Sequence, residues 1–590
     1  MRYAHAGVVR GGGRGSGRSR IPLPPSGARG SPRVTTGTYW QAIDRFREVV
    51  RSEPDREAVL YPDGTNPDGL PAYRDITYRE LDAWSDAIAE HLRAAGVGSG
   101  TRTIVLVLPS PELYAILFGL LKIGAVPVVI DPGMGVRKML RCLRAVDAEA
   151  FIGIPQAHAL RVLFRGGFRR VRTAVTVGRR WFWGGDTLRE WGRVPAGTLP
   201  AATPAPDGDL LVIGFTTGST GPAKAVEMTH GNLAAMVEQV HVARGEIAPQ
   251  TSLITLPLVG ILDLLLGSRC VLPPLIPSKV GATDPAHVVH AIETFGVRTM
   301  FASPAVLIPL LAHLRRHPAD LKSLRSIYSG GAPVPDWCIA GLREVLPEEI
   351  LIFAGYGSTE ALPMSTIESR ELFSGLTERT HRGDGTCIGR PAHRVEARII
   401  AVTDDPIPTW ERVDELAAEL EKTGGIGELV VAGPNVSSRY YWPESANLFG
   451  KIAEGDRIWH RTGDLAWIDD DGRIWFCGRK SQRVVTAAGP MFTVRVEQVF
   501  NVVAGVARTA LVGVGPRGAQ RPVLCFELEP GADAAAVEAA LRARGAEFEL
   551  TRTISDFLCH REFPVDIRHN AKIGREQLAV WAAKQLGVAR

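Results

Sequence analysis

The sequence lacks the features that mark secreted, zinc-binding and membrane-spanning proteins. Its seven cysteines are odd in number, scattered over 590 residues and without a closely spaced pair, which argues against a disulfide framework or a zinc motif. The longest apolar stretch, residues 114–130, is interrupted by Lys122, Gly124 and Pro127. It is therefore too polar for a membrane span, and no apolar segment near the N-terminus would serve as a secretory signal. We expect a cytoplasmic protein.

Positive charge is concentrated at the start of the chain. Residues 1–35 contain seven arginines and no acidic residue, whereas the whole chain has a formal net charge of +5, so the remainder carries −2. A basic body that would bind nucleic acid is not supported. The Gly/Arg/Pro/Ser-rich leader is expected to be disordered. We favour a misassigned start or a solvated arm over a phosphate-binding tail, and either over a transit peptide.

The length and the hydrophobic pattern predict a large α/β body. At 590 residues, with 45% hydrophobic and 22% charged residues, the chain exceeds what one core usually supports. A helix is expected after Thr77, with Glu80 completing a capping box, and it ends at Gly96. A strand at 103–108, a helix at 111–123 and a strand at 125–130 follow, which is the unit of a parallel sheet. Further strands are predicted at 150–154, 171–177, 252–256, 271–275, 299–302, 326–329 and 350–354.

The pattern changes after about residue 385. Short strands separated by Gly, Pro and Asp turns are predicted at 395–402, 427–432 and 475–478. Residues 480–590 mix strands (509–514, 523–528) with helices (534–544, 575–586). We therefore predict three parts: a leader at 1–35, a large N-terminal domain at 36–478 with parallel-type sheets and a distorted β-subdomain, and a small α+β C-terminal domain at 479–590.

A loop rich in glycine and hydroxyl groups follows the apolar run 210–215. It reads Phe-Thr-Thr-Gly-Ser-Thr-Gly-Pro-Ala-Lys-Ala-Val over residues 215–226, and we call residues 216–224 the phosphate loop. Glycine lets backbone N–H groups approach phosphate oxygens, hydroxyls add donors, and Lys224 adds positive charge. The loop predicts a site for a nucleoside triphosphate, through Thr216, Thr217, Gly218, Ser219, Thr220, Gly221 and Lys224.

An ordinary P-loop does not account for this segment. Counted from Gly218, the second glycine position is Ala223, and Ala225 stands where a magnesium-binding hydroxyl is needed. An incidental surface turn is the remaining alternative. The segment instead resembles the phosphate loop of the adenylate-forming enzymes, the superfamily of acyl-CoA synthetases, luciferases and peptide-synthetase adenylation domains.

Tyr356-Gly-Ser-Thr-Glu360 directly follows a predicted strand, which places it at the carboxyl edge of the sheet, where open α/β folds bind ligands. The resemblance implies that Tyr356 stacks on adenine, Thr359 contacts the α-phosphate and Glu360 holds magnesium. A carboxylate suits Mg²⁺, which prefers oxygen ligands. The alternative is a strand-to-helix turn capped by Thr359.

Three further segments match the superfamily in order. In Ser329-Gly-Gly-Ala-Pro333, the resemblance places Gly331, Ala332 and Pro333 along the edge of adenine. In Arg461-Thr-Gly-Asp-Leu465 it assigns Asp464 to the ribose hydroxyls, both of which one carboxylate can accept, and Arg479 to ribose or phosphate. In His569-Asn-Ala-Lys-Ile573 it assigns Lys572 as the adenylation lysine, although Ala571 replaces the usual glycine.

The resemblance covers about residues 40–580 and implies an enzyme with ATP and Mg²⁺ as cofactors. Its large N-terminal domain and small mobile C-terminal lid would enclose ATP and a carboxylic acid. The carboxylate attacks the α-phosphorus, giving acyl-AMP and pyrophosphate. Lys572, Thr359 and Glu360 are the expected catalytic residues, since a cation from a mobile domain neutralises charge that develops at the α-phosphate.

Several segments also resemble the olefin-pathway β-lactone synthetases. They are Asp131-Pro-Gly-Met-Gly135 and residues 151–155, 356–363, 475–480 and 566–572. This resemblance implies adenylation of a (2-alkyl-)3-hydroxy fatty acid, whose own hydroxyl then closes a β-lactone and expels AMP, and partners among other enzymes of a hydrocarbon or β-lactone pathway. An acyl-CoA or acyl-carrier-protein ligase is the alternative, and a non-catalytic nucleotide-binding scaffold is a remote one.

Some positions depart from the superfamily. Val259 and Gly260 stand where many acyl-CoA synthetases have an aromatic residue and a histidine, which predicts a roomier acyl end. Ser481 replaces the usual hinge Asp or Lys. The apolar segments 256–266 and 304–311 are candidates for an acyl tunnel or for core packing. No base for the β-hydroxyl is assigned, because His230 and His569 have equally good structural explanations.

Overall fold

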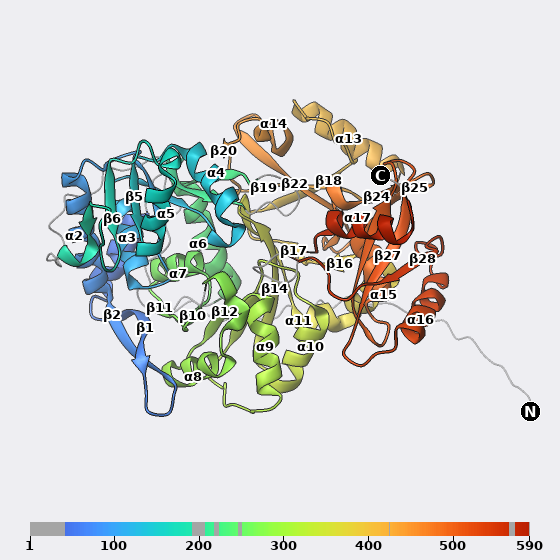
Figure 1. Ribbon diagram of the computed structural model, residues 1–590, viewed down its shortest axis with the longest axis horizontal. Helices are drawn as coiled ribbons and strands as arrows, with labels where there is room; N and C mark the ends of the chain where they lie inside the picture. Colours follow the sequence, from blue (N-terminus) through green and yellow to red (C-terminus); the bar gives the residue numbers. More distant parts are fainter. Residues whose placement is uncertain are drawn as a thin grey trace, which may run out of the picture. The chain divides into compact units, whose positions relative to one another are not determined.

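The computed structural model describes residues 42–191, 207–216, 223–245, 250–275, 277–423, 425–565 and 573–588. All of these belong to one compact unit, residues 37–590. The predicted leader at 1–35 lies outside the described residues. The large α/β body and the smaller C-terminal α+β part predicted from the sequence are both present (Figure 1).

The first large sheet carries the predicted strand–helix–strand unit. Strand β3 pairs in parallel with β4 and β5, and β4 pairs in parallel with β8. Only β9 and β20 add antiparallel pairs at one edge. In spatial order its strands are β20 (Tyr440–Trp442), β9 (Ala225–Thr229), β8 (Leu210–Phe215), β4 (Val126–Val129), β3 (Arg102–Leu106), β5 (Ala150–Gly153), β6 (Thr173–Thr176) and β7 (Asp186–Thr187).

The second large sheet is parallel at its centre and antiparallel at both edges. Strand β14 pairs in parallel with β13 and antiparallel with β15. In spatial order its strands are β17 (Arg390–Pro391), β15 (Ala361–Glu368), β14 (Leu351–Ser358), β13 (Ser326–Ser329), β12 (Thr299–Phe301), β10 (Thr251–Ile254), β11 (Arg269–Val271), β1 (Glu57–Thr65) and β2 (Pro71–Thr77).

The predicted β-rich region forms a third, antiparallel sheet. Its strands are β16 (Thr386–Cys387), β23 (Ile474–Arg479), β22 (Arg457–Ile468), β19 (Gly427–Ala432) and β18 (Glu396–Ile400), with β21 (Lys451–Glu454) paired to β22. The C-terminal residues build a hairpin of β24 (Val484–Thr486) and β25 (Gly489–Met491), and a sheet of β26 (Val506–Val514), β27 (Arg521–Leu528) and β28 (Asp556–Cys559). Figure 1 shows α16 and α17 beside this last sheet.

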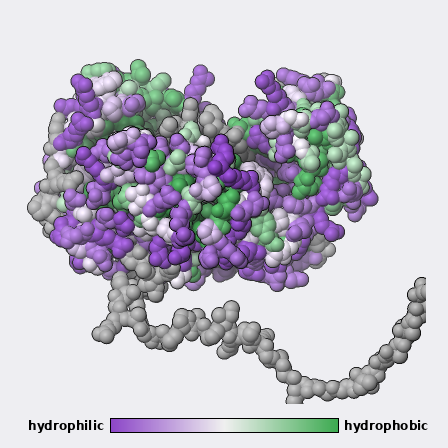
Figure 2. Space-filling model, turned by 90° about the horizontal axis from the view of Figure 1, so that it is seen from below, coloured by the Kyte–Doolittle hydropathy of each residue, from purple (hydrophilic) through white to green (hydrophobic). Residues whose placement is uncertain are grey.

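Helices cover the sheets. They are α1 (Ala42–Ser52), α2 (Tyr78–Ala94), α3 (Pro111–Lys122), α4 (Val136–Val146), α5 (Pro155–Leu163), α6 (His230–Arg244), α7 (Pro257–Leu265), α8 (Pro285–Phe295), α9 (Pro304–Leu314), α10 (Asp336–Val345), α11 (Ser369–Glu371), α12 (Thr377–Arg379), α13 (Trp410–Thr423), α14 (Ala446–Gly450), α15 (Thr493–Phe500), α16 (Ala534–Ala546) and α17 (Arg575–Gln585). On the face drawn in Figure 2 the surface is mostly hydrophilic, with hydrophobic side chains gathered in separate patches.

Local sequence signals account for α2. Thr77 is its N-cap, the Glu80 N–H donates to the Thr77 hydroxyl, and the Glu80 carboxylate accepts from the Thr77 N–H, so the predicted capping box is present. This arrangement satisfies two N–H groups that the first helical turn leaves without partners.

Two predicted strands are present with different bounds. The strand predicted at 350–354 continues to Ser358, and the next element is strand β15, so the alternative of a strand-to-helix turn capped by Thr359 fails. The strand predicted at 271–275 is β11, which ends at Val271. Pairing with neighbouring strands sets these boundaries, and a window of sequence does not contain that information.

A buried ionic cluster anchors α3 on α2. Lys122, which interrupts the longest apolar stretch, is fully buried, and its ammonium donates to Asp82 Oδ1 (2.6 Å), Asp86 Oδ1 (2.6 Å) and Ser85 Oγ (2.7 Å). The lysine that interrupts the apolar stretch therefore holds α3 against α2. Removing the lysine would leave two carboxylates buried without their cation.

Lys122→Ala should lower the free energy of unfolding by about 3–5 kcal/mol, the usual cost of removing one partner from a buried ion pair. Urea unfolding followed by circular dichroism measures the change. Lys322→Ala is the control, because Lys322 pairs with Asp320 at an exposed site and should change stability by less than about 0.5 kcal/mol. Equal stability of the two variants would contradict the assignment.

Candidate active site

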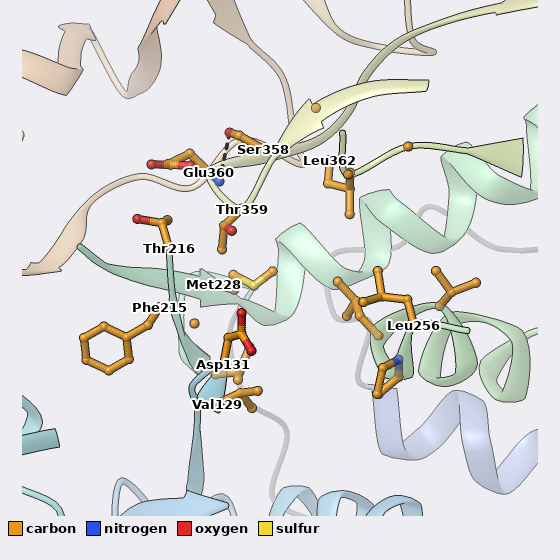
Figure 3. A pocket seen from close by; sticks show the side chains of 18 of the residues that line it. Val129, Asp131, Phe215, Thr216, Met228, Leu256, Ser358, Thr359, Glu360 and Leu362 are labelled. Atoms are coloured by element: carbon orange, nitrogen blue, oxygen red, sulfur yellow. Dashed lines mark hydrogen bonds between the residues drawn. The ribbon is translucent and has the colours of Figure 1, made fainter. Parts of the chain in front are cut away.

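Seven of the predicted site residues that the structure describes line one cavity of about 1270 Å³, and Asp464 lies behind its wall, in contact with the lining residues Tyr356 and Arg479. Its polar wall is built where β8, β13 and β14 end, so the carboxyl ends of parallel strands from two different sheets face each other. Thr216, Lys224, Tyr356, Thr359 and Glu360 all line it. Figure 3 shows Thr216 beside Thr359, with Asp131 below them and Leu256 on the opposite wall.

The phosphate loop connects two antiparallel strands, β8 and β9. The Thr216 N–H donates to the Lys224 carbonyl (2.9 Å), which closes the neck of this hairpin. A P-loop leads from a strand into a helix. The loop therefore differs from a P-loop in topology as well as in sequence. Five predicted residues lie outside the described residues, namely Thr217, Gly218, Ser219, Thr220 and Gly221.

The Tyr356–Glu360 motif lies next to this hairpin, as predicted. A Cβ added to Gly214 of β8 would lie only 3.3 Å from the Thr359 methyl carbon, so glycine allows Thr359 to approach the strand that carries the loop. The Glu360 N–H donates to Ser358 Oγ (3.2 Å; Figure 3).

Tyr440 joins Glu360 to the loop lysine. Strand β20 pairs with β9 so that Tyr440 lies opposite Val226. Its hydroxyl donates to Glu360 Oε1 (2.9 Å), and the ammonium of Lys224 lies 4.7 Å from the centre of its ring, a cation–π distance. A Cβ on Gly450 would meet the same ring at 2.8 Å, so glycine is required there.

Burial and neighbouring charge control ionisation around Glu360. Burial would raise the pKa of the Glu360 carboxyl, but surrounding positive charge and the Tyr440 hydroxyl outweigh it, and the pKa lies below its usual value. Burial lowers the pKa of His460 to about 3, which leaves the imidazole neutral. The relevant cation is therefore Lys451, whose pKa burial lowers to about 7. Its ammonium donates to Ser437 Oγ (2.9 Å) and lies 5.3 Å from the Tyr440 ring.

The predicted nucleoside residues form a second group. Strands β22 and β23 place Asp464 opposite Arg479, and Arg479 Nε lies 3.0 Å from Asp464 Oδ1. The Tyr356 hydroxyl donates to the other carboxylate oxygen. Burial raises the pKa of Asp464, and Arg479 opposes that shift. One carboxylate thus connects the predicted adenine, ribose and arginine positions.

Of the remaining predicted residues that the structure describes, only Gly331 is found at the cavity. Gly331 lines the cavity with a φ of +84°, whereas Ala332 and Pro333 are absent from its wall among the described residues. Lys572 lies outside the described residues. Sequence reasoning missed Tyr440 and His460, which line the cavity, and Lys451, which lies beside the Tyr440 ring. Strand pairing rather than any local motif brings them there.

The other walls of the cavity are apolar. They are formed by α3 (Leu113, Leu117, Leu121), α6 (Leu233, Met236, Val240) and α7 (Val259, Ile261, Leu262). Part of the candidate tunnel, residues 256–259, 261 and 262, therefore lines the cavity. The other candidate segment, 304–311, does not: its apolar side chains pack in a core with α8 and α10.

The roomier acyl end predicted from Val259 and Gly260 gains no space at Gly260. A Cβ on Gly260 would lie 2.2 Å from the hydroxyl oxygen of Tyr114, and Gly260 is absent from the cavity wall among the described residues. Tyr114 is fully buried. The Tyr114 side chain occupies the volume that a larger residue at position 260 would need. The glycine at this position therefore makes room for Tyr114 and leaves the cavity no larger there.

The sequence pattern of the AMP-binding enzyme family matches residues 46–441. The chain belongs to this family. At 44% identity over 554 residues it is similar to the olefin beta-lactone synthetase of Stenotrophomonas maltophilia (strain K279a), with 92% of this chain and 98% of that protein covered. The olefin beta-lactone synthetase of Xanthomonas campestris pv. campestris is 43% identical over 547 residues, with 91% and 96% covered.

A solved structure of the family has the same fold. The O-succinylbenzoate coenzyme A synthetase of Bacillus subtilis, in complex with ATP and magnesium ion, matches with a TM-score of 0.69 at 20% identity, over 90% of this chain and 98% of that chain. The resemblances expected from the motifs, to the adenylate-forming superfamily and to the β-lactone synthetases, are confirmed.

The donor set around Glu360 fits a magnesium ion. Within the described parts of the chain, no group of three or more His, Cys, Asp or Glu side chains could hold a metal. The buried Glu360 carboxylate, whose pKa is lowered and which is held by Tyr440, would be the protein ligand. This arrangement suits Mg²⁺, which is usually bound through one or two carboxylates plus phosphate oxygens and water.

Tyr440→Phe should raise the Mg²⁺ concentration needed for half-maximal ATP–pyrophosphate exchange by about tenfold or more, because a hydrogen bond to a charged group contributes about 1.5–3 kcal/mol. Exchange measured over a magnesium titration tests this expectation. Tyr441→Phe is a matched control, since its hydroxyl only donates to the Val146 carbonyl at 3.4 Å. An unchanged magnesium requirement in Tyr440→Phe would contradict the positioning role.

Proposed function

We propose that the protein is an ATP-dependent β-lactone synthetase that activates a (2-alkyl-)3-hydroxy fatty acid in the cytoplasm. The observation that carries this proposal is the 44% identity that extends over 98% of a curated olefin beta-lactone synthetase. A cavity that joins a polar, phosphate-type wall to long apolar walls supports it.

In the first step, the acid's carboxylate oxygen bonds to the α-phosphorus of ATP, and pyrophosphate leaves. Thr216, Lys224 and the rest of the phosphate loop would hold the β- and γ-phosphates. Thr359 would donate to the α-phosphate, and Lys572 would neutralise its developing charge.

The nucleoside would be held by a second group of residues. Asp464 and Arg479 would hold the ribose, with Tyr356 and Gly331 against adenine. Magnesium at Glu360 would shield the phosphate charges that oppose the attack.

In the second step, the β-hydroxyl oxygen bonds to the acyl carbon, the bond from that carbon to the phosphate oxygen breaks, and AMP leaves. The hydroxyl proton passes to solvent or to AMP. Ring strain opposes closure, so the acid must first carry a good leaving group. A cavity that holds the chain folded supplies the proximity, which for well-oriented intramolecular attack is worth effective molarities of about 10⁵–10⁸ M.

An acyl-CoA ligase is the second candidate, because both activities share every residue of the ATP site. It is less favoured. The feruloyl-CoA synthase of an Amycolatopsis species is 30% identical over 80% of its length, well below the β-lactone synthetases. A non-catalytic scaffold is disfavoured because Thr216, Lys224, Glu360, Asp464 and Lys572 are all retained.

Incubation with ATP, Mg²⁺ and a 2-alkyl-3-hydroxy acid, without any thiol, should release one AMP per β-lactone or per alkene formed from it. Mass spectrometry of the product tests the proposal. The matching acid without the 3-hydroxyl is the control: it should form acyl-AMP and no lactone. Turnover that requires coenzyme A would overturn the lactone assignment and support the ligase.

Lys572→Ala and Asp464→Ala should impair two different steps, adenylate formation and ATP binding. Lys572→Ala should abolish adenylate formation and leave ATP affinity within about twofold, because its charge acts on the transition state. Asp464→Ala should weaken ATP binding by about tenfold or more through lost hydrogen bonds to a charged group. Calorimetry and pyrophosphate release separate the two effects, and Lys584→Ala is an exposed control. Normal pyrophosphate release by either variant would contradict the mapping.

A further inference from the structure

One stretch of the body is strongly basic although the body as a whole is slightly acidic. Residues 150–185 contain seven arginines and no aspartate or glutamate. Arg165, Arg169, Arg172 and Arg179 are exposed, and Arg170 is exposed and pairs with Asp147 at 2.9 Å. The average charge of the body therefore hides a local surface that attracts anions.

Large apolar side chains are exposed on the same stretch. The exposed fraction is 76% for Leu163, 40% for Phe164, 60% for Trp181 and 81% for Phe182. Single exposed apolar residues are common, but a cluster of this kind marks an interaction site. We call these four residues, with Arg165, Arg169, Arg172 and Arg179, the α5 surface.

The turn that presents the tryptophan and phenylalanine is held on α5. The Trp183 ring stacks on His158 with centroids 5.5 Å apart. Its indole N–H donates to Thr176 Oγ1 (3.0 Å), and Arg161 Nη2 donates to its carbonyl (3.4 Å). With Trp183 fixed in this way, Trp181 and Phe182 remain exposed, directly after the exposed Arg179 and Arg180 in the chain.

The same helix also forms part of the acyl cavity. Gln156, Ala157 and Leu160 of α5 line the cavity, together with Leu108 and Val136, which are each about half exposed. Leu163 and Phe164 come one helical turn after Leu160, and the Phe164 N–H donates to the Leu160 carbonyl (3.0 Å). The apolar end of the α5 surface therefore begins next to a residue that lines the cavity.

We propose that the α5 surface docks the enzyme on an anionic lipid bilayer. Arginines attract acidic headgroups, at roughly fivefold in affinity per residue near the surface, while Trp, Phe and Leu enter the interface between headgroups and acyl chains. A nucleic acid would use the arginines but would leave Leu163 without an apolar partner. Among the described residues no helix is long and apolar enough to cross a membrane, so the contact is peripheral.

Docking goes beyond the catalytic proposal and does not depend on it. Only the consequence that a long-chain acid moves from the bilayer into the cavity rests on the proposed function. Lactone formation from a water-soluble 3-hydroxy acid should then be the same with and without vesicles, and lactone formation from a vesicle-borne acid should depend on docking.

Co-sedimentation of the full chain with vesicles tests the proposal. Binding should be strong to equal mixtures of phosphatidylcholine and phosphatidylglycerol, weak to phosphatidylcholine alone, and reduced by high salt. Trp181→Ser/Phe182→Ser should lower binding at least about tenfold, and Arg169→Glu/Arg172→Glu should do the same on anionic vesicles only. The basic leader is unchanged in each variant, so its contribution cancels.

Trp337→Ser is the matched control, because Trp337 is a similarly exposed tryptophan on α10. It should bind vesicles as the unmodified chain does, and every variant should keep its activity on the water-soluble acid, which verifies folding. Vesicle binding that is equal in the double variants and the unmodified chain would overturn the proposal. The proposal would also be overturned if the α5-surface substitutions changed only self-association of the protein, or only its binding to duplex DNA.

Discussion

The hydrogen bond from Tyr440 to Glu360 is the contact on which the polar half of the cavity depends. Tyr440 belongs to the edge strand of one large sheet, and Glu360 follows strand β14 of the other. The bond therefore joins the two sheets at the point where their carboxyl ends meet. Lys224 and Lys451 both lie near the same ring, so one side chain positions a carboxylate and organises two cations around it.

The negative charges of two buried carboxylates in this half of the site are balanced by neighbouring cations rather than by water. Glu360 and Asp464 are both buried, and each has a cation and a tyrosine hydroxyl beside it. Uncompensated, either carboxylate would be costly in such an environment. Lys224 and Arg479 line the cavity and make this wall positive, which suits the charge of a polyphosphate.

The apolar half of the cavity has a different origin. Its walls are the inner faces of α3, α6 and α7, and packing between neighbouring side chains sets its outline. The contact between Tyr114 and Gly260 illustrates this, because a departure in one segment is compensated by a residue far away in sequence. Helix α5 lines the cavity through Gln156, Ala157 and Leu160 and ends at Leu163 of the proposed lipid-binding surface.

The sequence by itself determined the family, the order of its motifs and most parallel strands, because these features depend on local residue types and hydrophobic period. It also predicted that Tyr356, Thr359 and Glu360 would lie beside the loop. Only the tertiary structure decided that Tyr440 and Lys451 join the site, that β14 leads into a strand rather than a helix, and that Tyr114 fills the space at Gly260. These outcomes depend on strand pairing and side-chain packing between segments distant in the chain, and no local pattern encodes such contacts.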